Sequence, residues 1–207
     1  IRHVLSDKEL NVSVRRKNYD FSVLGVFYAR RKFVYESAKK MHKLHLYNPW
    51  LLHKLRKALN RHHKRSYWSN ALLNMLFNDA LRRSRISYTD GSHLDIFVRK
   101  YLEIPANHAL LLCAPFRGMQ DFGFVQDVHY VRCDEENLAE QLHALLTDGA
   151  LCESIVQNSF ALVQEFYSPA KVATQLLSIF AQMSAGTFTG CYYHKGELCF
   201  GTRLENA

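Results

Sequence analysis

Short apolar stretches alternate with longer amphipathic stretches along most of this chain. Four of the short stretches predict buried strands, at residues 20–26, 86–88, 109–113 and 129–131. Apolar positions at helical spacing predict helices over residues 33–46, 50–64, 71–83, 95–106, 134–146, 150–166 and 169–183. Strands that alternate with helices favour a parallel sheet covered on both faces. The pattern therefore predicts an α/β fold, a Rossmann-like three-layer domain with a mostly parallel sheet flanked by helices.

The end of the chain has a different pattern. Strand-forming residues on either side of Lys195-Gly196 predict a small hairpin that turns there, after the last two helices. The chain begins at Ile1 rather than at methionine, so we interpret it as a fragment or a trimmed protein. We expect three parts, namely a linker or remnant of an inter-domain connection at 1–19, the Rossmann-like domain at 20–183, and a C-terminal hairpin extension at 184–207.

Composition narrows the class of protein. Of the 207 residues, 48% are hydrophobic and 22% are charged, which is typical of a soluble globular chain. No apolar run has the length that a membrane helix requires, and the polar first segment does not resemble a secretory signal. The five cysteines are scattered without a CxxC pair, which favours free thiols in a reducing cytoplasm. Cys191 and Cys199 flank the predicted hairpin, and a pairing between them stays open.

The net charge of +8 is unevenly distributed. Residues 30–65 are rich in arginine, lysine and histidine, whereas residues 134–165 lean acidic. A basic half indicates an anionic partner, and nucleic acid, a phosphorylated ligand and an anionic membrane surface all remain open.

The most informative polar residues surround the predicted helix 95–106. Parallel sheets bind ligands at the carboxyl ends of their strands, so the loops after residues 26, 89 and 113 should converge on one crevice. The turn with Gly91, Ser92 and His93 precedes a helix that carries Asp95 and Glu103, eight positions apart. Each residue turns a helix by about 100°, so the two acids should lie about 80° apart and face one cleft. Carboxylates accept hydrogen bonds from vicinal hydroxyls and a helix start offers N–H groups to phosphate, which predicts a phosphorylated polyol ligand.

Three consecutive basic residues, Arg30, Arg31 and Lys32, follow the first predicted strand at the edge of this crevice. Guanidinium groups bind phosphate through paired hydrogen bonds and offset charge that develops on a leaving diphosphate. The alternative for these residues is a solvated helix start. For Glu103 it is an ion pair with Arg99 or Lys100.

Sequence signatures of other chemistries are absent. The chain has no GxSxG, GxxxxGK[ST] or HExxH motif. His62 and His63 lack partners at the spacing of metal ligands, so we predict no metal site.

From about residue 20 to residue 180, an ordered set of motifs resembles the C-terminal, donor-binding half of GT-B-fold glycosyltransferases of the group 1, family 4-like type. The set comprises, in order, VLGVFYARR at 23–31, ALRRSRIS at 80–87, RKYLEIPA at 99–106, ALLL at 109–112, GF at 123–124, HYV at 129–131 and NLAEQL at 137–142. Two departures stand out. The paired acids of the family are usually both glutamates, whereas the first here is Asp95. The usual Ala-Cys-Gly after the acid helix is Ala106-Asn107-His108.

The resemblance implies a role for each candidate residue. Glu103 would accept hydrogen bonds from the ribose of a nucleotide diphosphate sugar. Asp95 would orient the transferred sugar, and Arg31 would act with it in catalysis. The other residues implied to bind the nucleotide sugar are Arg30, Lys32, Gly91, Ser92 and His93.

The resemblance also implies the reaction, which is transfer of a sugar to a glycan or lipid-linked acceptor in polysaccharide biosynthesis. It implies retention of anomeric configuration, no metal, and no cofactor besides the donor substrate. An N-terminal acceptor-binding domain would be missing from this chain. We expect a cytoplasmic protein whose basic residues 42–65 can rest on the anionic cytoplasmic membrane face. Two alternatives remain, a non-catalytic scaffold module that kept the fold and a nucleic-acid-binding domain.

Overall fold

The structure is a computed structural model of the whole chain, and it describes residues 3–50, 54–55, 57–58, 67–91 and 94–201. Most of the predicted basic helix 50–64, including His62 and His63, lies outside these residues.

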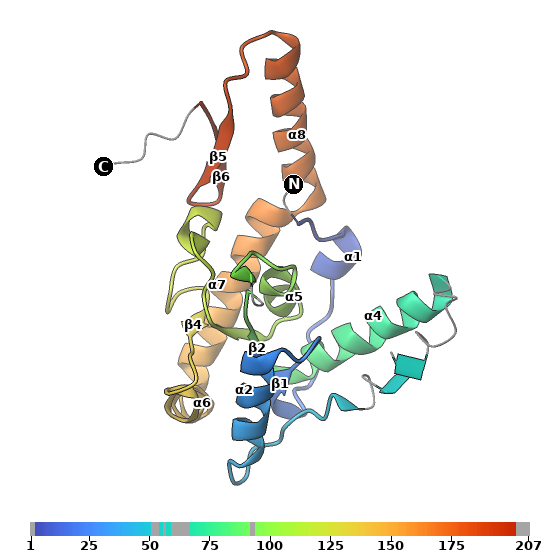
Figure 1. Cartoon of the computed structure of the whole chain (residues 1–207), viewed down its shortest axis with the longest axis vertical. Coiled ribbons are helices and arrows are strands. Elements are labelled where there is room, and N and C mark those ends of the chain that lie inside the picture. Colours follow the sequence, from blue (N-terminus) through green and yellow to red (C-terminus); the bar gives the residue numbers. More distant parts are fainter. Residues whose placement is uncertain (1–2, 51–53, 56, 59–66, 92–93, 202–207) are drawn as a thin grey trace.

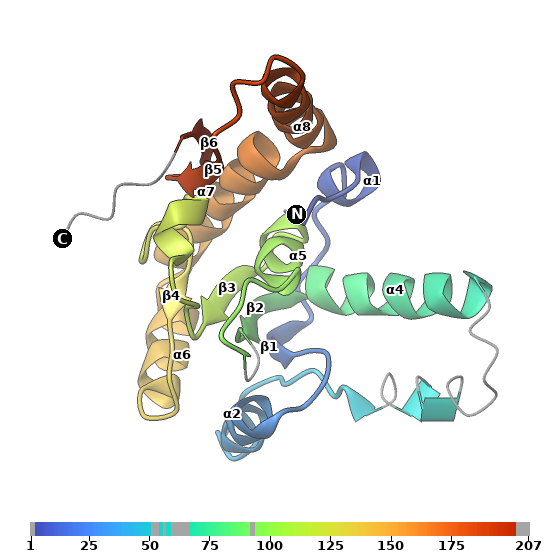
Figure 2. The same cartoon turned by 45° about the horizontal axis from the view of Figure 1, so that its top comes forward.

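The centre of the molecule is a four-stranded parallel sheet (Figure 2). Its strands are β1 (Tyr19–Val23), β2 (Ser84–Thr89), β3 (Leu110–Cys113) and β4 (Val131–Arg132). They lie side by side in the order of the chain, and every neighbouring pair is parallel. All four carboxyl ends therefore lie at the same edge of the sheet, as predicted. Helices cover both faces of such a sheet, so β2 and β3 are almost wholly buried.

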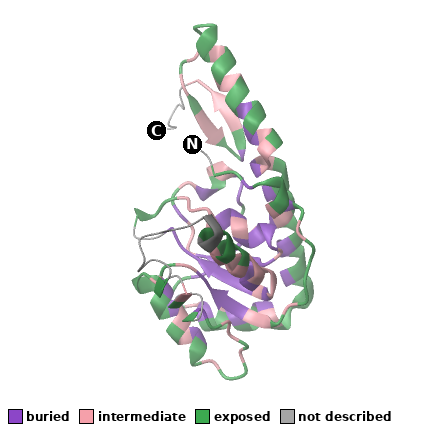
Figure 3. Ribbon diagram, turned by 90° about the vertical axis from the view of Figure 1, so that its right-hand side faces the viewer, coloured by how far each residue is buried: buried purple, intermediate pink, exposed green. Residues whose placement is uncertain are grey.

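Helices cover both faces of the sheet, so the predicted three-layer fold is confirmed. On one face, α2 (Ala29–Lys39) and α6 (Leu138–Thr147) pack on Phe21, Ile86 and Leu112. On the other, α4 (Tyr67–Arg82), α5 (Lys100–Ala106) and α7 (Gly149–Tyr167) surround Leu24 and Leu111. Figure 3 shows the buried strands between these layers.

The last part of the chain extends away from the sheet (Figure 1). Helix α8 (Pro169–Ser184) begins as predicted, with Ser168 accepting a hydrogen bond from Lys171 N and proline at the first helical position. The hairpin is formed by β5 (Cys191–His194) and β6 (Glu197–Phe200). Lys195 and Gly196 both have positive φ, 49° and 89°, as a two-residue hairpin turn requires.

The hairpin packs on the 3₁₀ helix η2 (Met119–Phe122), where the rings of Phe122 and Tyr193 lie 5.5 Å apart. Cys191 and Cys199 are both free, and each faces an aromatic residue of the other strand rather than its counterpart. The short helix α1 (Asp7–Leu10) lies against α5. Among the described residues, no helix combines the length and hydrophobicity needed to cross a bilayer.

Candidate functional site

The loops that follow β1 and β2 meet at the carboxyl edge of the sheet, and Arg31 joins them. Its guanidinium forms an ion pair with the Asp90 carboxylate, with Nη2 and Oδ1 2.5 Å apart. It also donates to the carbonyl of Asp90 at 2.9 Å and to the carbonyl of Val26 at 3.2 Å. Both side chains are only 3% exposed, so this is a buried pair that ties the two loops together.

The three consecutive basic residues have different environments. Arg31 points inward, whereas Arg30 and Lys32 are exposed on the first turn of α2. Neighbouring helical positions point about 100° apart, so one residue of the three faces the sheet and the others face solvent. In the described part of the chain, Nε of Arg31 has no hydrogen-bond acceptor. The structure thus brings Arg31 to the predicted edge and leaves one of its donors unused.

Gly91 is the second residue after β2, and backbone atoms of the same loop pack closely against it. Ile96 N donates to the Gly91 carbonyl at 3.1 Å. A Cβ added at Gly91 would lie 2.9 Å from Ile96 N and 3.0 Å from Ile96 O, both backbone atoms that a side-chain movement cannot shift. Glycine is therefore required where this loop folds back on itself. Ser92 and His93 lie outside the described residues.

The prediction of one helix over 95–106 is wrong at its start, because α5 begins at Lys100. Asp95 has φ 50°, outside the range of a right-handed helix, and its side chain is exposed. Two tertiary contacts account for the shorter helix. The backbone N–H of Ile96 is hydrogen-bonded to the Gly91 carbonyl, and the ring of Phe97 stacks on Phe122 with centroids 4.9 Å apart. Asp95 and Glu103 therefore do not share a helix face.

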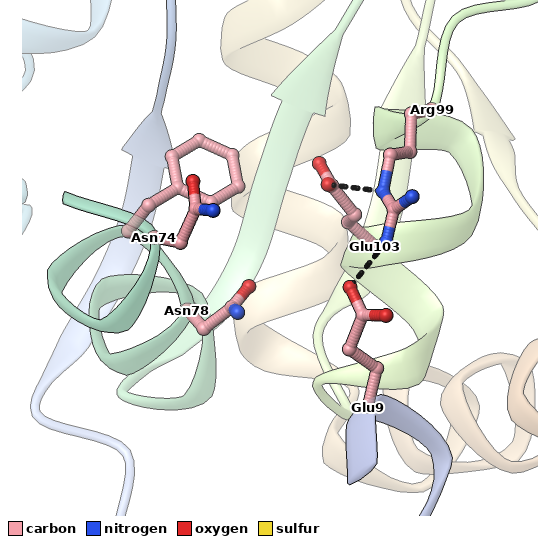
Figure 4. A pocket seen from close by; sticks show the side chains of 6 residues that line it. Glu9, Asn74, Asn78, Arg99 and Glu103 are labelled. Atoms are coloured by element: carbon pink, nitrogen blue, oxygen red, sulfur yellow. Dashed lines mark hydrogen bonds and ion pairs between the residues drawn. The ribbon is translucent and has the colours of Figure 1, made fainter. Parts of the chain in front are cut away.

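Glu103 lies in the middle of α5 with its side chain 17% exposed. Its Oε1 accepts a hydrogen bond from Arg99 Nε at 2.9 Å, and Arg99 Nη2 also pairs with Glu9 of α1 (Figure 4). Burial raises the pKa of the Glu103 carboxyl, although Arg99 and then Lys100 act in the opposite direction. The ion pair with Arg99, which was the alternative for Glu103, is thus present. Glu103 is nevertheless no ordinary surface glutamate, because little of it meets solvent.

Glu103 also borders a cavity of about 360 Å³ between α4 on one side and α1 and α5 on the other. Figure 4 shows Glu103 and Arg99 facing Asn74 and Asn78 across this space. Hydrogen-bonding groups form most of its wall, and we call it the α4–α5 cavity; its lining is Glu9, Asn74, Phe77, Asn78, Arg99 and Glu103. Carboxylates, amides and a guanidinium supply both donors and acceptors, which suits a ligand with several hydroxyls.

Sequence reasoning missed Glu9, Asn74 and Asn78. The two asparagines are four residues apart on α4, with Asn70 four residues earlier, so a polar stripe was visible in the sequence. Nothing in the sequence linked that stripe to Glu103, which is 25 residues beyond Asn78.

When this chain is compared with known proteins, it is similar to solved structures, but its sequence has no match. No protein-family model and no curated protein matches the sequence. Anabaena HepE, solved in complex with UDP and glucose, has a TM-score of 0.57 and 10% identity over 80% of this chain and 48% of its own. Sucrose-phosphate synthase from Thermosynechococcus elongatus has a TM-score of 0.53 and 12% identity over 86% and 48% of the two chains. A third structure, the C-terminal domain of the glycosyl transferase group 1 protein LpcC from Francisella tularensis, has a TM-score of 0.49 and 16% identity over 78% and 92%.

This chain spans about half the length of HepE and of sucrose-phosphate synthase. At identities of 9–13% these structures show similarity of fold alone. The predicted resemblance in fold to one half of a GT-B-fold glycosyltransferase is confirmed.

Proposed function

We propose that this chain is the donor-binding half of a glycosyltransferase and that it binds a nucleotide diphosphate sugar beside α5. One observation carries the proposal, namely that Glu103 is mostly buried yet borders a polar cavity in a domain of this fold. A carboxylate withdrawn from solvent costs free energy unless hydrogen bonds compensate it. Arg99 supplies one such bond, and ligand hydroxyls in the α4–α5 cavity would supply others. HepE, whose fold is similar, was solved with UDP-glucose and with UDP and glucose.

In this proposal the nucleoside occupies the α4–α5 cavity. Glu103 accepts hydrogen bonds from the ribose hydroxyls, and Arg99 holds the carboxylate in place through Oε1. Asn74 and Asn78 offer amide donors and acceptors from the opposite wall.

The diphosphate and the transferred sugar would lie toward the carboxyl edge of the sheet. Gly91 opens the loop whose backbone would face the diphosphate, with Ser92 and His93 following it. The exposed Arg30 and Lys32 would supply positive charge from α2. Asp95 stays the predicted residue for orienting the sugar. Arg31 stays the predicted residue for offsetting the charge of the leaving diphosphate, and its buried pairing with Asp90 fixes its position at this edge.

The finer parts of the reaction belong to the same proposal. The acceptor would be a glycan or lipid-linked molecule held by a second, N-terminal domain, and transfer would retain the anomeric configuration without a metal. The protein would work in the cytoplasm, where its basic residues can approach the anionic face of the membrane.

Isothermal titration calorimetry with uridine, guanosine and thymidine diphosphates tests the proposal. We expect one of them to bind, and we expect Glu103→Gln to weaken that binding by at least about tenfold, because a hydrogen bond to a charged group contributes about 1.5–3 kcal/mol. Glu140→Gln is the matched control, since Glu140 is exposed on α6, on the other face of the sheet. Binding of a nucleotide that Glu103→Gln leaves unchanged would exclude the ribose role.

A second function, the non-catalytic scaffold, is favoured by a different observation. The charges of Glu103 and Arg31 are each already matched by a partner within the chain, Arg99 and Asp90. The same titration separates the two functions, because a scaffold should bind none of the nucleotides.

A further inference from the structure

Two carboxylates share one guanidinium beside the α4–α5 cavity. Nε of Arg99 donates to Oε1 of Glu103 at 2.9 Å, and Nη2 of Arg99 pairs with Oε1 of Glu9 at 2.5 Å (Figure 4). Nε and Nη2 lie on the same side of a guanidinium, where they form a fork that can bind both oxygens of a single carboxylate. In this protein the fork is divided between an acid of α5 and an acid of α1.

This division leaves one oxygen of Glu103 available. In the described part of the chain, Oε1 of Glu103 is hydrogen-bonded to Arg99, whereas Oε2 has no hydrogen bond. The Glu103 side chain is 17% exposed and borders the α4–α5 cavity. Its Oε2 is therefore the acceptor that remains for a ligand with hydroxyl groups in this cavity.

Glu9 is held in place by its own helix and by the core. Its Oε2 accepts hydrogen bonds from the backbone N and from Oγ of Ser6 at 2.8 and 2.7 Å, which form the capping box of α1. Leu5 and Leu10, on either side of Glu9 in sequence, are 0% and 6% exposed in the same hydrophobic core as α5. Glu9 is therefore fixed, and its Oε1 holds Nη2 of Arg99 toward α1.

We propose that Glu9 is a positioning residue of the nucleotide site, which acts through Arg99 to keep Oε2 of Glu103 free for the ribose. This inference rests on the proposed function, since it concerns the same carboxylate. Without the charge of Glu9, Glu103 is the stronger acceptor for both nitrogens, because hydrogen bonds to an ionised group are about twice as strong as neutral ones. The fork of Arg99 then closes on both oxygens of Glu103 and occupies the ribose acceptor. A residue of the segment predicted as a linker, before β1, thus contributes to the site.

Calorimetry on three variants tests this coupling. The diphosphate that binds the wild type is titrated into Glu9→Gln, Glu103→Gln and the double variant. We expect Glu9→Gln to bind at least about tenfold more weakly, because the ligand loses the same charged acceptor that Glu103→Gln removes. The double variant should bind no more weakly than Glu103→Gln, because no carboxylate remains for Arg99 to close on. Asp7→Asn, which removes an exposed charge from the same helix, is the matched control and should bind as the wild type does.

A second measurement needs no nucleotide. Burial raises the pKa of Glu103, the charges of Arg99 and then Lys100 on α5 lower it, and the charge of Glu9 on α1 raises it. The α4 wall of the cavity consists of two asparagines and a phenylalanine, which do not titrate. Carbon-13 NMR of the side-chain carboxyl, assigned with Glu103→Gln, should show that Glu9→Gln lowers the pKa of Glu103. This change should be larger than the one that Glu9→Gln causes in an Arg99→Gln background, where only the loss of the Glu9 charge acts.

Circular dichroism checks that each variant is folded. If Glu9→Gln does not fold, Glu9→Met keeps the unbranched stem and carries the same expectations. Wild-type affinity in Glu9→Gln, while Glu103→Gln binds weakly, overturns the inference and leaves the proposed function standing. Losses that add in the double variant also overturn it, because they indicate that Glu9 contacts the ligand independently of Glu103. Equal pKa changes with and without Arg99 have the same consequence.

The failure of the proposed function has a different signature. If the wild type binds no nucleoside diphosphate, or if Glu103→Gln binds the diphosphate as the wild type does, both proposals are overturned.

Discussion

Removing the charge of Asp90 should destabilise this protein strongly. In Asp90→Asn the Arg31 guanidinium keeps its position, 3% exposed, but loses the carboxylate 2.5 Å away. Among the described residues, the carbonyls of Val26 and residue 90 remain to accept its hydrogen bonds. Breaking a buried ion pair by removing one partner costs about 3–5 kcal/mol, because an uncompensated charge stays in the interior. Since domains are stable by about 5–15 kcal/mol, this is a large share of the total.

Urea unfolding at neutral pH measures the effect, and the chain contains a matched control. Lys171 and Glu197 form an ion pair at 2.9 Å with side chains 32% and 52% exposed, so Glu197→Gln should cost at most about 1 kcal/mol. The double variant Arg31→Met with Asp90→Asn removes both buried charges and should be more stable than the two single effects added together. A loss for Asp90→Asn no larger than that for Glu197→Gln would refute the reasoning, because it would mean that water or another group compensates Arg31.

Two further predictions concern the backbone and a buried lysine. Gly91→Ala should lower the melting temperature, because its Cβ would meet backbone atoms of Ile96 at 2.9–3.0 Å. The control is Gly149→Ala, which has open space around it at the start of α7 and should be neutral or stabilising by up to about 1 kcal/mol. Equal melting temperatures of the two variants would contradict the close approach of Ile96 to Gly91. Burial lowers the pKa of Lys17 from 10.5 to about 8, so the unfolded chain binds more protons between these values. The unfolding free energy relative to Lys17→Met should therefore rise with pH from about 8 to about 10.5, and a flat difference across that range would contradict the burial of the charge.

The positions of the strands were predictable because a strand that is buried on both faces appears in the sequence as a continuous run of apolar residues. Residues 109–113 are apolar throughout, and β3 (Leu110–Cys113) lies within them. Strand β2 is longer than the predicted 86–88 since it begins with Ser84 and ends with Thr89, which are polar yet fully buried. Ser84 donates its hydroxyl hydrogen bond to the carbonyl of Ala80, so its polarity is satisfied locally and hidden from a hydrophobic pattern.

The helix start at residue 95 was mispredicted for a tertiary reason. Helical periodicity places Asp95, Phe97 and Tyr101 plausibly on one helix, but periodicity does not report a positive φ or a loop closure. Phe97 contributes more by joining the aromatic cluster of Phe116, Phe122 and Tyr101 than by forming one more helical turn. Such contacts come from segments that are distant in sequence, so a single sequence did not contain the boundary.

The sequence predicted which loops meet at the carboxyl edge of the sheet, but it did not predict which residues line the α4–α5 cavity. Parallel topology is enough to bring the loops with Arg31 and Gly91 together. It does not say which of three adjacent cations faces inward, because that depends on how α2 rotates against the sheet. Nor does it bring in Glu9 and Asn74, since these come from helices whose packing partners the sequence does not name.

The orientation of Glu103 is determined by the burial of most of α5. Five of its seven residues are buried, namely Tyr101, Leu102, Ile104, Pro105 and Ala106, so the core determines how the helix is rotated. The remaining two residues, Lys100 and Glu103, are three positions apart and lie on the less buried side of the helix. Tyr101 adds a further restraint by donating its hydroxyl to the Ala114 carbonyl at 2.8 Å, beyond the end of β3. The Glu103 carboxylate, which is proposed to hold the ribose, is therefore oriented by the apolar packing behind it, and a substitution in that packing should weaken nucleotide binding.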